Sequence, residues 1–241
     1  GRSGWRAGCR THDEALAVAR AIAAAPRLVL AGVAGFEGLA PTDDDAQAFL
    51  DDLRSVTIAL ADHDLVGGEV IVSAGGSAHF DLVTATLGGD WLPGRRLRTI
   101  LRSGASVSHD DGMYRESTPF HRLPGEGTLD AALAVWAQVL STPEPGYALV
   151  GMGKRDAPHD DLPIPLRIRR SDGRIEPADG LRVTRLNDQH GHLEVRPPTV
   201  LAPGDLIAFG ISHPCLAFDK WPVIPVVEDD DTVTELLKTY F

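Results

Sequence analysis

The sequence contains very little lysine and cysteine. Among its 241 residues there are three lysines, Lys154, Lys220 and Lys238, and two cysteines, Cys9 and Cys215. Two cysteines exclude a disulfide scaffold. No stretch of eighteen apolar residues occurs, so the sequence predicts no membrane-spanning segment. No signal peptide is visible, and a cytoplasmic location is the default expectation.

Basic residues are also fewer than acidic residues. The chain has 23 Lys and Arg residues against 34 Asp and Glu residues, which gives a formal net charge of −11. This balance argues against a nucleic-acid-binding protein, which normally carries a basic surface. The hydrophobic fraction of 43% is ample for a packed core. The length suits one large domain or two small ones.

Helical spacing and short apolar runs alternate along the first 140 residues. Strands separated by helices pair in parallel, but three strands do not close a barrel, and an eight-fold barrel needs about 250 residues. Residues 1–141 are therefore predicted to be the second half of a (β/α)8 barrel, which agrees with the abrupt start of the chain in a helical pattern. The expected helices cover residues 11–25, 43–63, 79–87 and 128–140, and the expected strands cover residues 28–34, 69–73 and 98–102.

The pattern changes after Ser141. Short strands punctuated by Pro, Gly and Asp follow one another, and no helix is expected until residues 232–240. Residues 142–241 are therefore predicted to form an all-β domain with a terminal helix. The overall fold class is α/β, with a half-barrel followed by this β-domain. The expected strands cover residues 147–151, 164–168, 181–185, 192–195, 205–210 and 223–227.

Two glycine-containing turns follow consecutive expected strands. Gly75, Gly76 and Ser77 come after one strand, and Ser103 and Gly104 come after the next. Backbone N–H groups in such turns can bind an anion, and barrel enzymes commonly hold a phosphate group with adjacent late-strand loops. The alternative is a tight strand-to-helix turn that needs glycine for its backbone conformation.

A third polar segment covers residues 108–114. It carries His109, Asp110 and Tyr114 in a loop after a strand, where functional residues often lie. The alternative is a surface turn, because Asp-Gly is a strong turn signal.

His213 and Cys215 flank Pro214 in the most distinctive segment of the chain. In an extended backbone these two side chains point to the same side, and an imidazole with a thiolate makes half of a zinc site. Two ligands suit a catalytic metal with open positions rather than a closed structural site. The alternative is a buried thiol beside a hydrogen-bonded histidine.

The other histidines are assigned no function. A second pair, His190 and His192, is explained by a hairpin turn around Gly191. The scattered histidines in polar surroundings are expected on the surface: His12, His63, His79, His121 and His159.

Together these segments resemble the D-serine dehydratase and D-threonine aldolase family. Its members are fold-type III pyridoxal-phosphate enzymes with an alanine-racemase-like barrel and a C-terminal β-domain. GISHPC followed by AFDKW is similar to the metal-binding signature of the D-serine-deaminase-like branch. The segments VSAGGS, LRSG and HDDGMY look like its phosphate-side barrel segments, and GRSG and GVAGFEG resemble mid-barrel segments. The resemblance extends over essentially the whole chain.

The resemblance implies roles for individual residues. His213 and Cys215 match the zinc pair of the family. Pyridoxal 5'-phosphate would be held at its phosphate by Gly75, Gly76, Ser77, Ser103 and Gly104, and Arg2 matches an arginine that reaches toward this cofactor. His109 and Tyr114 would face a small D-amino acid substrate. The resemblance also implies a homodimer.

One departure from the family concerns lysine. The Schiff-base lysine of the family lies on the first barrel strand, upstream of the segment that matches Gly1, and Lys154, Lys220 and Lys238 all lie in or beyond the predicted β-domain. The chain is therefore expected to be the C-terminal portion of a longer enzyme. A non-catalytic relative is the alternative.

The function implied is a zinc- and pyridoxal-phosphate-dependent D-amino acid lyase. A D-serine dehydratase, which releases pyruvate and ammonia, is favoured because the thiolate at Cys215 suits zinc. A D-threonine aldolase is the second possibility and a non-catalytic zinc- or phosphate-binding remnant the third. An alanine-type racemase is disfavoured because it has no use for the His213 and Cys215 pair.

Overall fold

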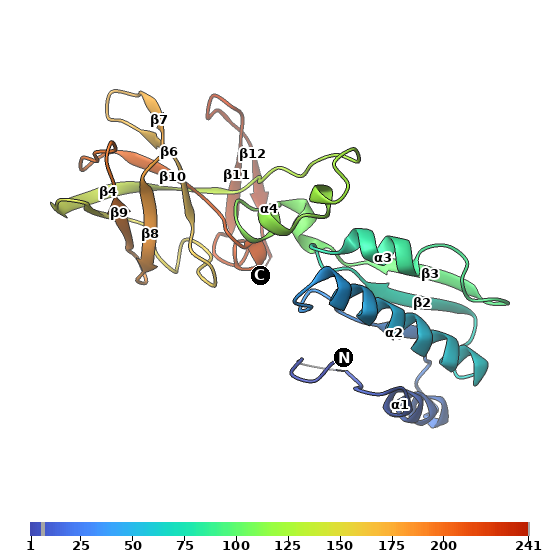
Figure 1. Ribbon diagram of the computed structural model, residues 1–241. Helices are drawn as coiled ribbons and strands as arrows, with labels where there is room; N and C mark the ends of the chain where they lie inside the picture. Colours follow the sequence, from blue (N-terminus) through green and yellow to red (C-terminus); the bar gives the residue numbers. More distant parts are fainter. Residues whose placement is uncertain (6–7, 241) are drawn as a thin grey trace. The chain divides into compact units, whose positions relative to one another are not determined.

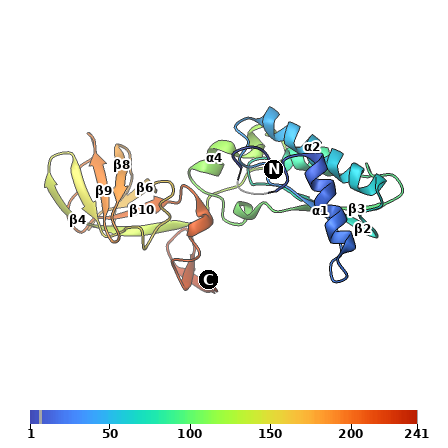
Figure 2. The same cartoon turned by 90° about the horizontal axis from the view of Figure 1, so that it is seen from below.

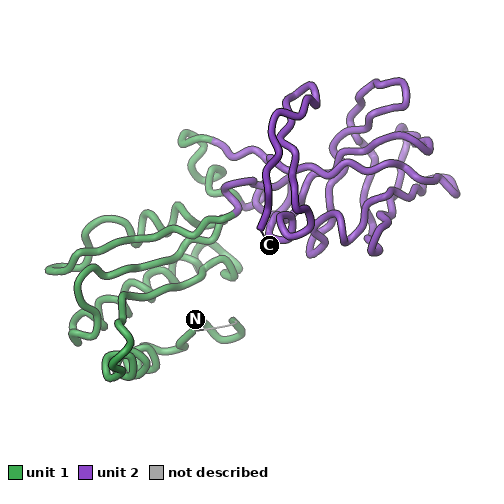
Figure 3. Tube along the Cα trace, turned by 180° about the vertical axis from the view of Figure 1, so that it is seen from behind, with its two compact units in different colours: residues 1–104, 118–127 green, residues 105–117, 128–241 purple. Residues whose placement is uncertain are grey.

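The computed structural model describes residues 1–5 and 8–240, and the chain forms two compact units (Figures 1 and 3). The first unit contains residues 1–104 and 118–127, and the second contains residues 105–117 together with everything after residue 127. The sequence placed the junction near Ser141. In the structure a single strand runs through Ser141, and the 105–117 segment joins the second unit.

The first unit is a parallel three-stranded sheet covered by helices (Figures 1 and 2). The strands lie in the order β1-β2-β3, and helices α2 and α3 pack on the sheet and on each other, while α1 packs on α2. The expected alternation of helices and parallel strands is confirmed. The elements are α1 (His12–Ala24), β1 (Gly32–Ala34), α2 (Asp43–Asp62), β2 (Glu69–Ala74), α3 (Phe80–Leu87) and β3 (Arg96–Leu101).

Two threonines start the longer helices of this unit. The hydroxyl of Thr11 accepts a hydrogen bond from the Glu14 N–H at 3.2 Å, and Thr42 accepts one from the Asp45 N–H at 3.1 Å. Such caps satisfy backbone donors that the helix leaves free at its first turn. Helix α2 also begins with three aspartates, Asp43 to Asp45, which favour the positive end of the helix dipole.

The second unit is built on an antiparallel seven-stranded sheet in the order β7-β6-β10-β4-β5-β9-β8 (Figure 1). Its core contains fully buried Val150, Met152, Leu193, Ile207 and Phe209. A separate hairpin pairs β11 with β12. The strands are β4 (Ala134–Glu144), β5 (Tyr147–Val150), β6 (Ile164–Arg169), β7 (Ile175–Pro177), β8 (Leu181–Leu186), β9 (Gly191–Val195), β10 (Leu206–Gly210), β11 (Val223–Val227) and β12 (Val233–Lys238).

The helix expected over residues 128–140 is wrong, because this segment contributes to strand β4. Ala137 and Val139 are buried, whereas Gln138 between them and Leu140 after them are exposed, which is the two-residue period of a strand. Strand β4 pairs with β10 on one side and with β5 on the other. The apolar residues of this segment also fit a helical spacing. The segment is a strand because it forms hydrogen bonds with strands that lie far away in the sequence.

The terminal helix expected over residues 232–240 is also wrong. Val233–Lys238 forms strand β12, which pairs antiparallel with β11, with Val223 opposite Lys238.

No helix in the described part of the chain is long and apolar enough to cross a membrane. The remaining short helices are η1 (Gly104–Val107), α4 (Met113–Ser117), η2 (Pro119–His121) and η3 (Pro214–Leu216).

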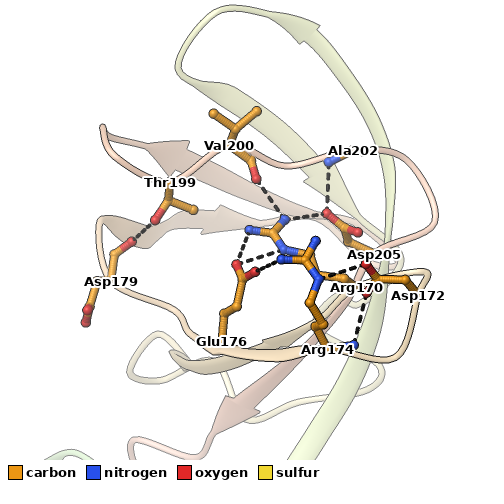
Figure 4. A network of polar contacts seen from close by, with 9 residues as sticks. All are labelled: Arg170, Asp172, Arg174, Glu176, Asp179, Thr199, Val200, Ala202 and Asp205. Atoms are coloured by element: carbon orange, nitrogen blue, oxygen red, sulfur yellow. Dashed lines mark hydrogen bonds and ion pairs between the residues drawn. The ribbon is translucent and has the colours of Figure 1, made fainter.

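A network of charged residues is centred on Arg170, directly after β6 in the antiparallel sheet (Figure 4). The guanidinium donates to Glu176 at 2.6 and 2.9 Å, to Asp205 at 2.8 Å and to the Val200 carbonyl at 2.8 Å. Asp205 is 4% exposed and also accepts from the Ala202 N–H at 3.0 Å. The hydrogen bonds from Arg170 therefore neutralise a buried carboxylate and join β6, β7 and the loop before β10.

Replacing Arg170 with alanine is expected to lower the free energy of unfolding of the second unit by about 3–5 kcal/mol, because Asp205 would remain buried without its counter-ion. The matched control is Arg174→Ala. Arg174 also contacts Glu176, at 3.1 Å, but it is well exposed, so its removal should cost at most about 1 kcal/mol. Urea denaturation followed by hydrogen exchange in β6 and β10 measures both. Equal losses in the two variants would contradict the central role of Arg170.

His192 is buried inside the second unit, although the sequence explained it only as part of a turn. The turn exists between β8 and β9, but the His192 side chain is 6% exposed and its Nδ1 is hydrogen-bonded to the Tyr147 hydroxyl. Burial, followed by the positive charge of Arg185, lowers the pKa of His192 below 6.5. Burial therefore disfavours the charged form of this imidazole in the folded protein.

Because the folded pKa of His192 lies below the unfolded value, the unfolded chain binds this proton first as the pH falls. Stability is then expected to decrease below about pH 6.5, with a contribution of at most about 1.4 kcal/mol per pH unit from this residue. Chemical denaturation at a series of pH values, compared between the wild type and His192→Gln, isolates the effect. His63→Gln, which removes an exposed histidine, is the control. An unchanged pH slope in His192→Gln would contradict the prediction.

Candidate functional site

The glycine-containing turns after β2 and β3 lie side by side in the first unit. The two strands are parallel neighbours, with Ala74 opposite Leu101, so both turns leave the same edge of the sheet. The Ser103 hydroxyl donates to the Gly75 carbonyl at 3.3 Å. The structure therefore brings together the two segments that the sequence predicted to form a phosphate site.

The N–H groups of Gly75 and Gly76 already have an acceptor, the carboxylate of Glu37. Glu37 is fully buried and accepts from the Gly75 N–H at 3.1 Å and from the Gly76 N–H. Gly75 has φ +104°, which favours glycine, and a Cβ on Gly76 would lie 3.1 Å from the Phe36 ring. Both glycines are thus accounted for by the turn and by the loop that carries Glu37.

Sequence reasoning missed Glu37, although one signal was present. A glutamate lies between Phe36 and Gly38 directly after an apolar strand, where a buried carboxylate requires donors. The neighbouring residues Ser77 and Ser103 are partly exposed, and a Cβ on Gly104 would meet no atom within 4 Å. The role of Ser77, Ser103 and Gly104 in binding a phosphate group stays a prediction.

Two arginines lie in the same unit. Arg102 donates to the Gly35 carbonyl at 2.5 Å and to the Ser73 hydroxyl, so it links the ends of all three strands. Arg2, predicted to reach toward the cofactor, is 3.6 Å from the Asp52 carboxylate of α2. Its proposed role stays a prediction.

The start of α3, just after Ser77, is held by ion pairs. Arg122 donates to Asp81 at 2.8 and 2.9 Å and to the Ala78 carbonyl at 2.8 Å. Partial burial opposes ionisation of Asp81, but the hydrogen bonds from Arg122 hold its pKa below the usual value. His79 is 8% exposed and lies 3.3 Å from Asp43, so its expected surface position is wrong.

In the second unit, the His213 and Cys215 segment follows the end of β10. His213 is extended, with φ −152°, but Pro214–Leu216 forms the 3-10 turn η3. The expected extended geometry across both residues is therefore wrong at Cys215. The Nδ1 atom of His213 is paired with the Asp160 carboxylate, and the Ser212 hydroxyl donates to the Leu162 carbonyl. The residues that follow are anchored by Trp221, whose indole N–H donates to the Asp156 carbonyl at 2.8 Å.

The loop with His109 and Tyr114 packs against this same segment. The Asp111 N–H donates to the Ile211 carbonyl and the Met113 N–H to the Ser212 carbonyl, both at 2.8 Å. The two backbones approach so closely that a Cβ on Gly112 would lie 2.8 Å from the Ser212 Cα. The loop is therefore fixed against residues 211–212 by main-chain contacts.

This contact places Tyr114 beside His213. The two ring centroids are 5.9 Å apart, with an interplanar angle of 65°. His109 is 5% exposed and adopts a left-handed backbone with φ 48°, and its N–H donates to the Ala105 carbonyl at 2.6 Å. Of the two residues predicted to face a substrate, Tyr114 is the one that lies next to the predicted metal pair.

Asp110 is a buried carboxylate in the same loop. Its Oδ1 accepts from the N–H groups of Gly112 at 3.0 Å and Tyr114 at 2.9 Å, whereas its buried Oδ2 has no hydrogen-bond partner among the described residues. Burial and the charges of Asp160 and Asp110 raise the pKa of the Cys215 thiol. The same negative charges favour a divalent cation, so this donor set is compatible with zinc.

The structure adds no third ligand to the predicted pair of His213 and Cys215. In residues 1–5 and 8–240, no group of three or more His, Cys, Asp or Glu side chains is arranged to hold a metal ion. A zinc ion held by His213 and Cys215 alone would have one protein ligand fewer than the three that catalytic zinc sites usually have, so their role as metal ligands stays a prediction.

Comparison with known proteins adds independent evidence. Residues 132–227 match the model of the family described as "Putative serine dehydratase domain". A search of curated proteins found no significant match. Among solved structures, D-threonine aldolase from Filomicrobium marinum is similar, with 26% identity and a TM-score of 0.69 over 98% of this chain and 60% of its own.

Two further solved structures share the fold. D-threo-3-hydroxyaspartate dehydratase from Delftia sp. HT23 is 20% identical, with a TM-score of 0.60 over 99% of this chain and 64% of its own. An alanine-racemase-like protein from Idiomarina loihiensis is 16% identical, with a TM-score of 0.62 over 98% of this chain and 62% of its own. The chain thus spans about three-fifths of the length of each.

The parallel half-barrel and the β-rich second unit therefore define an alanine-racemase-like fold. Within that class, residues 132–227 match the serine dehydratase family model, and the chain is similar over 98% of its length to a D-threonine aldolase. The resemblance predicted from the sequence motifs is confirmed.

Replacing Glu37 with alanine is expected to lower the free energy of unfolding of the first unit by about 2–4 kcal/mol, because two buried N–H groups lose their acceptor. Amide hydrogen exchange at Gly75 and Gly76 should accelerate with it. Glu69→Ala is the matched control, since Glu69 pairs with exposed Arg98 and should contribute at most about 1 kcal/mol. Unchanged exchange at Gly75 and Gly76 in Glu37→Ala would contradict the role assigned to Glu37.

Proposed function

We propose that this chain is the C-terminal part of a zinc- and pyridoxal-phosphate-dependent D-amino acid lyase, most consistent with a D-serine dehydratase. The observation that carries the proposal is the cluster of His213, Cys215, Tyr114 and the buried Asp110 on one face of the second unit. The matched family model and the similarity to a D-threonine aldolase support the lyase class.

Pyridoxal phosphate, when bound, withdraws electrons from the α-carbon of an amino acid, and zinc polarises a β-hydroxyl. Ser77, Ser103 and Gly104 would lie beside the phosphate group, where Gly104 leaves open space because it has no side chain. Glu37 orders the backbone at Gly75 and Gly76 on which Ser77 depends. Arg2 is kept as a proposed contact to the cofactor.

In the second unit, His213 and Cys215 would hold the metal. Asp110 and Asp160 add negative charge, which offsets the charge of the cation. The Tyr114 and His213 rings are in contact at a steep angle, so Tyr114 is proposed to face a substrate bound at the metal. His109 belongs to the same loop and is buried, so its proposed role is to support the conformation of the loop that carries Tyr114.

The choice between dehydratase and aldolase depends on the fate of the β-hydroxyl. A dehydratase expels it and breaks the Cβ–O bond, whereas an aldolase removes its proton and breaks the Cα–Cβ bond. The thiol at Cys215 favours zinc over harder cations, which is the reason for preferring the dehydratase. The D-amino acid substrate, a homodimer and a cytoplasmic location remain predictions.

The test uses the polypeptide encoded by the native gene, supplied with pyridoxal phosphate and zinc. Pyruvate and ammonia from D-serine, but not from L-serine, are the expected products, and Cys215→Ala or His213→Ala should lower kcat/KM by at least about a hundredfold. An intact mass above 25.7 kDa would show a longer polypeptide than this chain.

The alternatives predict different products. Glycine and an aldehyde from D-threonine, without pyruvate from D-serine, would replace the dehydratase with the aldolase. Retained zinc binding without turnover of either amino acid would favour a non-catalytic metal-binding protein.

A further inference from the structure

The side chain of Asp160 is hydrogen-bonded to His213, which is one of the two predicted metal ligands. Its carboxylate is paired with Nδ1 of the imidazole, and it belongs to the loop before β6, more than fifty residues from His213. The His213 side chain is 16% exposed and that of Asp160 is 41% exposed. The pair therefore lies at the boundary between the interior of the second unit and solvent.

The chemistry of the two groups determines where the imidazole proton lies. An ionised carboxylate only accepts hydrogen bonds, so the proton of a neutral His213 must be on Nδ1. The lone pair is then on Nε2, which is the atom available to bind a cation. Without an acceptor at Nδ1, the ring would exchange between two tautomers and rotate more freely.

The backbone on both sides of His213 is fixed independently. The Ser212 hydroxyl donates to the Leu162 carbonyl, the Ser212 carbonyl accepts from the Met113 N–H at 2.8 Å, and the proline after His213 begins η3. The Asp160 and Ser212 contacts both involve the loop of residues 160–162. One short loop thus holds the main chain before His213 and also the imidazole itself.

We propose that Asp160 is a positioning residue for the metal centre: it fixes the Nδ1–H tautomer and the ring orientation of His213, so that Nε2 is directed to zinc. The inference rests on the proposed function, since it needs His213 as a metal ligand. Carboxylate partners of this kind raise the basicity of a histidine ligand, and their loss typically weakens metal binding by about 10–100-fold.

The experiment compares zinc affinity in Asp160→Ala and Asp160→Asn of the full chain, measured by competition with a chromophoric chelator. Asp160→Ala should bind zinc about 10–100-fold more weakly than the wild type. Asp160→Asn keeps a neutral acceptor at the same place, and its affinity should lie between the two. Asp161→Asn is the matched control, because Asp161 carries the same charge one residue away and accepts from the N–H of Leu162 at 3.0 Å. It should stay within about threefold of the wild type.

A second measurement needs no metal. Long-range 15N–1H NMR of the metal-free chain at about pH 8 reports which ring nitrogen of His213 carries the proton. The wild type should show the Nδ1–H form, and Asp160→Ala should show a mixture or the Nε2–H form. If Asp160 only stabilised the fold, its replacement would not change which ring nitrogen of His213 carries the proton.

The outcomes separate the inference from the proposed function. If Asp160→Ala bound zinc as tightly as the wild type, and His213→Ala did not bind it, the positioning role of Asp160 would be overturned. This holds whether or not the tautomer of His213 changed. Equal zinc binding in the wild type and His213→Ala would overturn the metal site itself, and with it both proposals.

Discussion

The predicted metal pair depends on one main-chain contact, the docking of the loop at residues 111–113 onto residues 211–212. Two N–H groups of that loop donate to two consecutive carbonyls at the end of β10, each at 2.8 Å. This contact is possible because Gly112 has no side chain to separate the backbones, and because Gly210 leaves room for the side chain of Asp111. It places Tyr114 against His213 and Asp110 near Cys215, residues about a hundred positions apart in the chain.

Carboxylates organise both candidate regions, but in different ways. Glu37 is saturated by two backbone donors, so its charge serves the conformation of the turn at Gly75 and Gly76. Asp110 satisfies one oxygen with backbone donors and leaves the other buried without a partner among the described residues. Burial of an uncompensated charged oxygen is costly, and a nearby cation would relieve that cost. The two residues therefore differ: both oxygens of Glu37 accept hydrogen bonds from the turn, whereas one oxygen of Asp110 is left for the proposed cation.

The errors in secondary structure share one physical cause. Residues 128–140 and 232–240 both carry apolar residues at spacings that a helix could also bury, and both form strands because another strand offers hydrogen bonds along their length. Local sequence does not reveal such a partner. In contrast, helices α1 and α2 carry their own signals, a threonine cap and acidic residues in the first turn, and these were predicted correctly.

The sequence by itself determined the class of the fold, the parallel pairing of β1 to β3 and the candidate segments, because those features are recorded in local periodicity, glycine positions and the His-Pro-Cys motif. Only the tertiary structure decided what each segment contacts. It revealed that Glu37 occupies the N–H groups of Gly75 and Gly76, that the loop at residues 105–117 belongs to the second unit, and that Asp160 bonds to His213. Each of these features depends on contacts between residues more than thirty positions apart. No local pattern in the chain specifies which donor pairs with which distant acceptor.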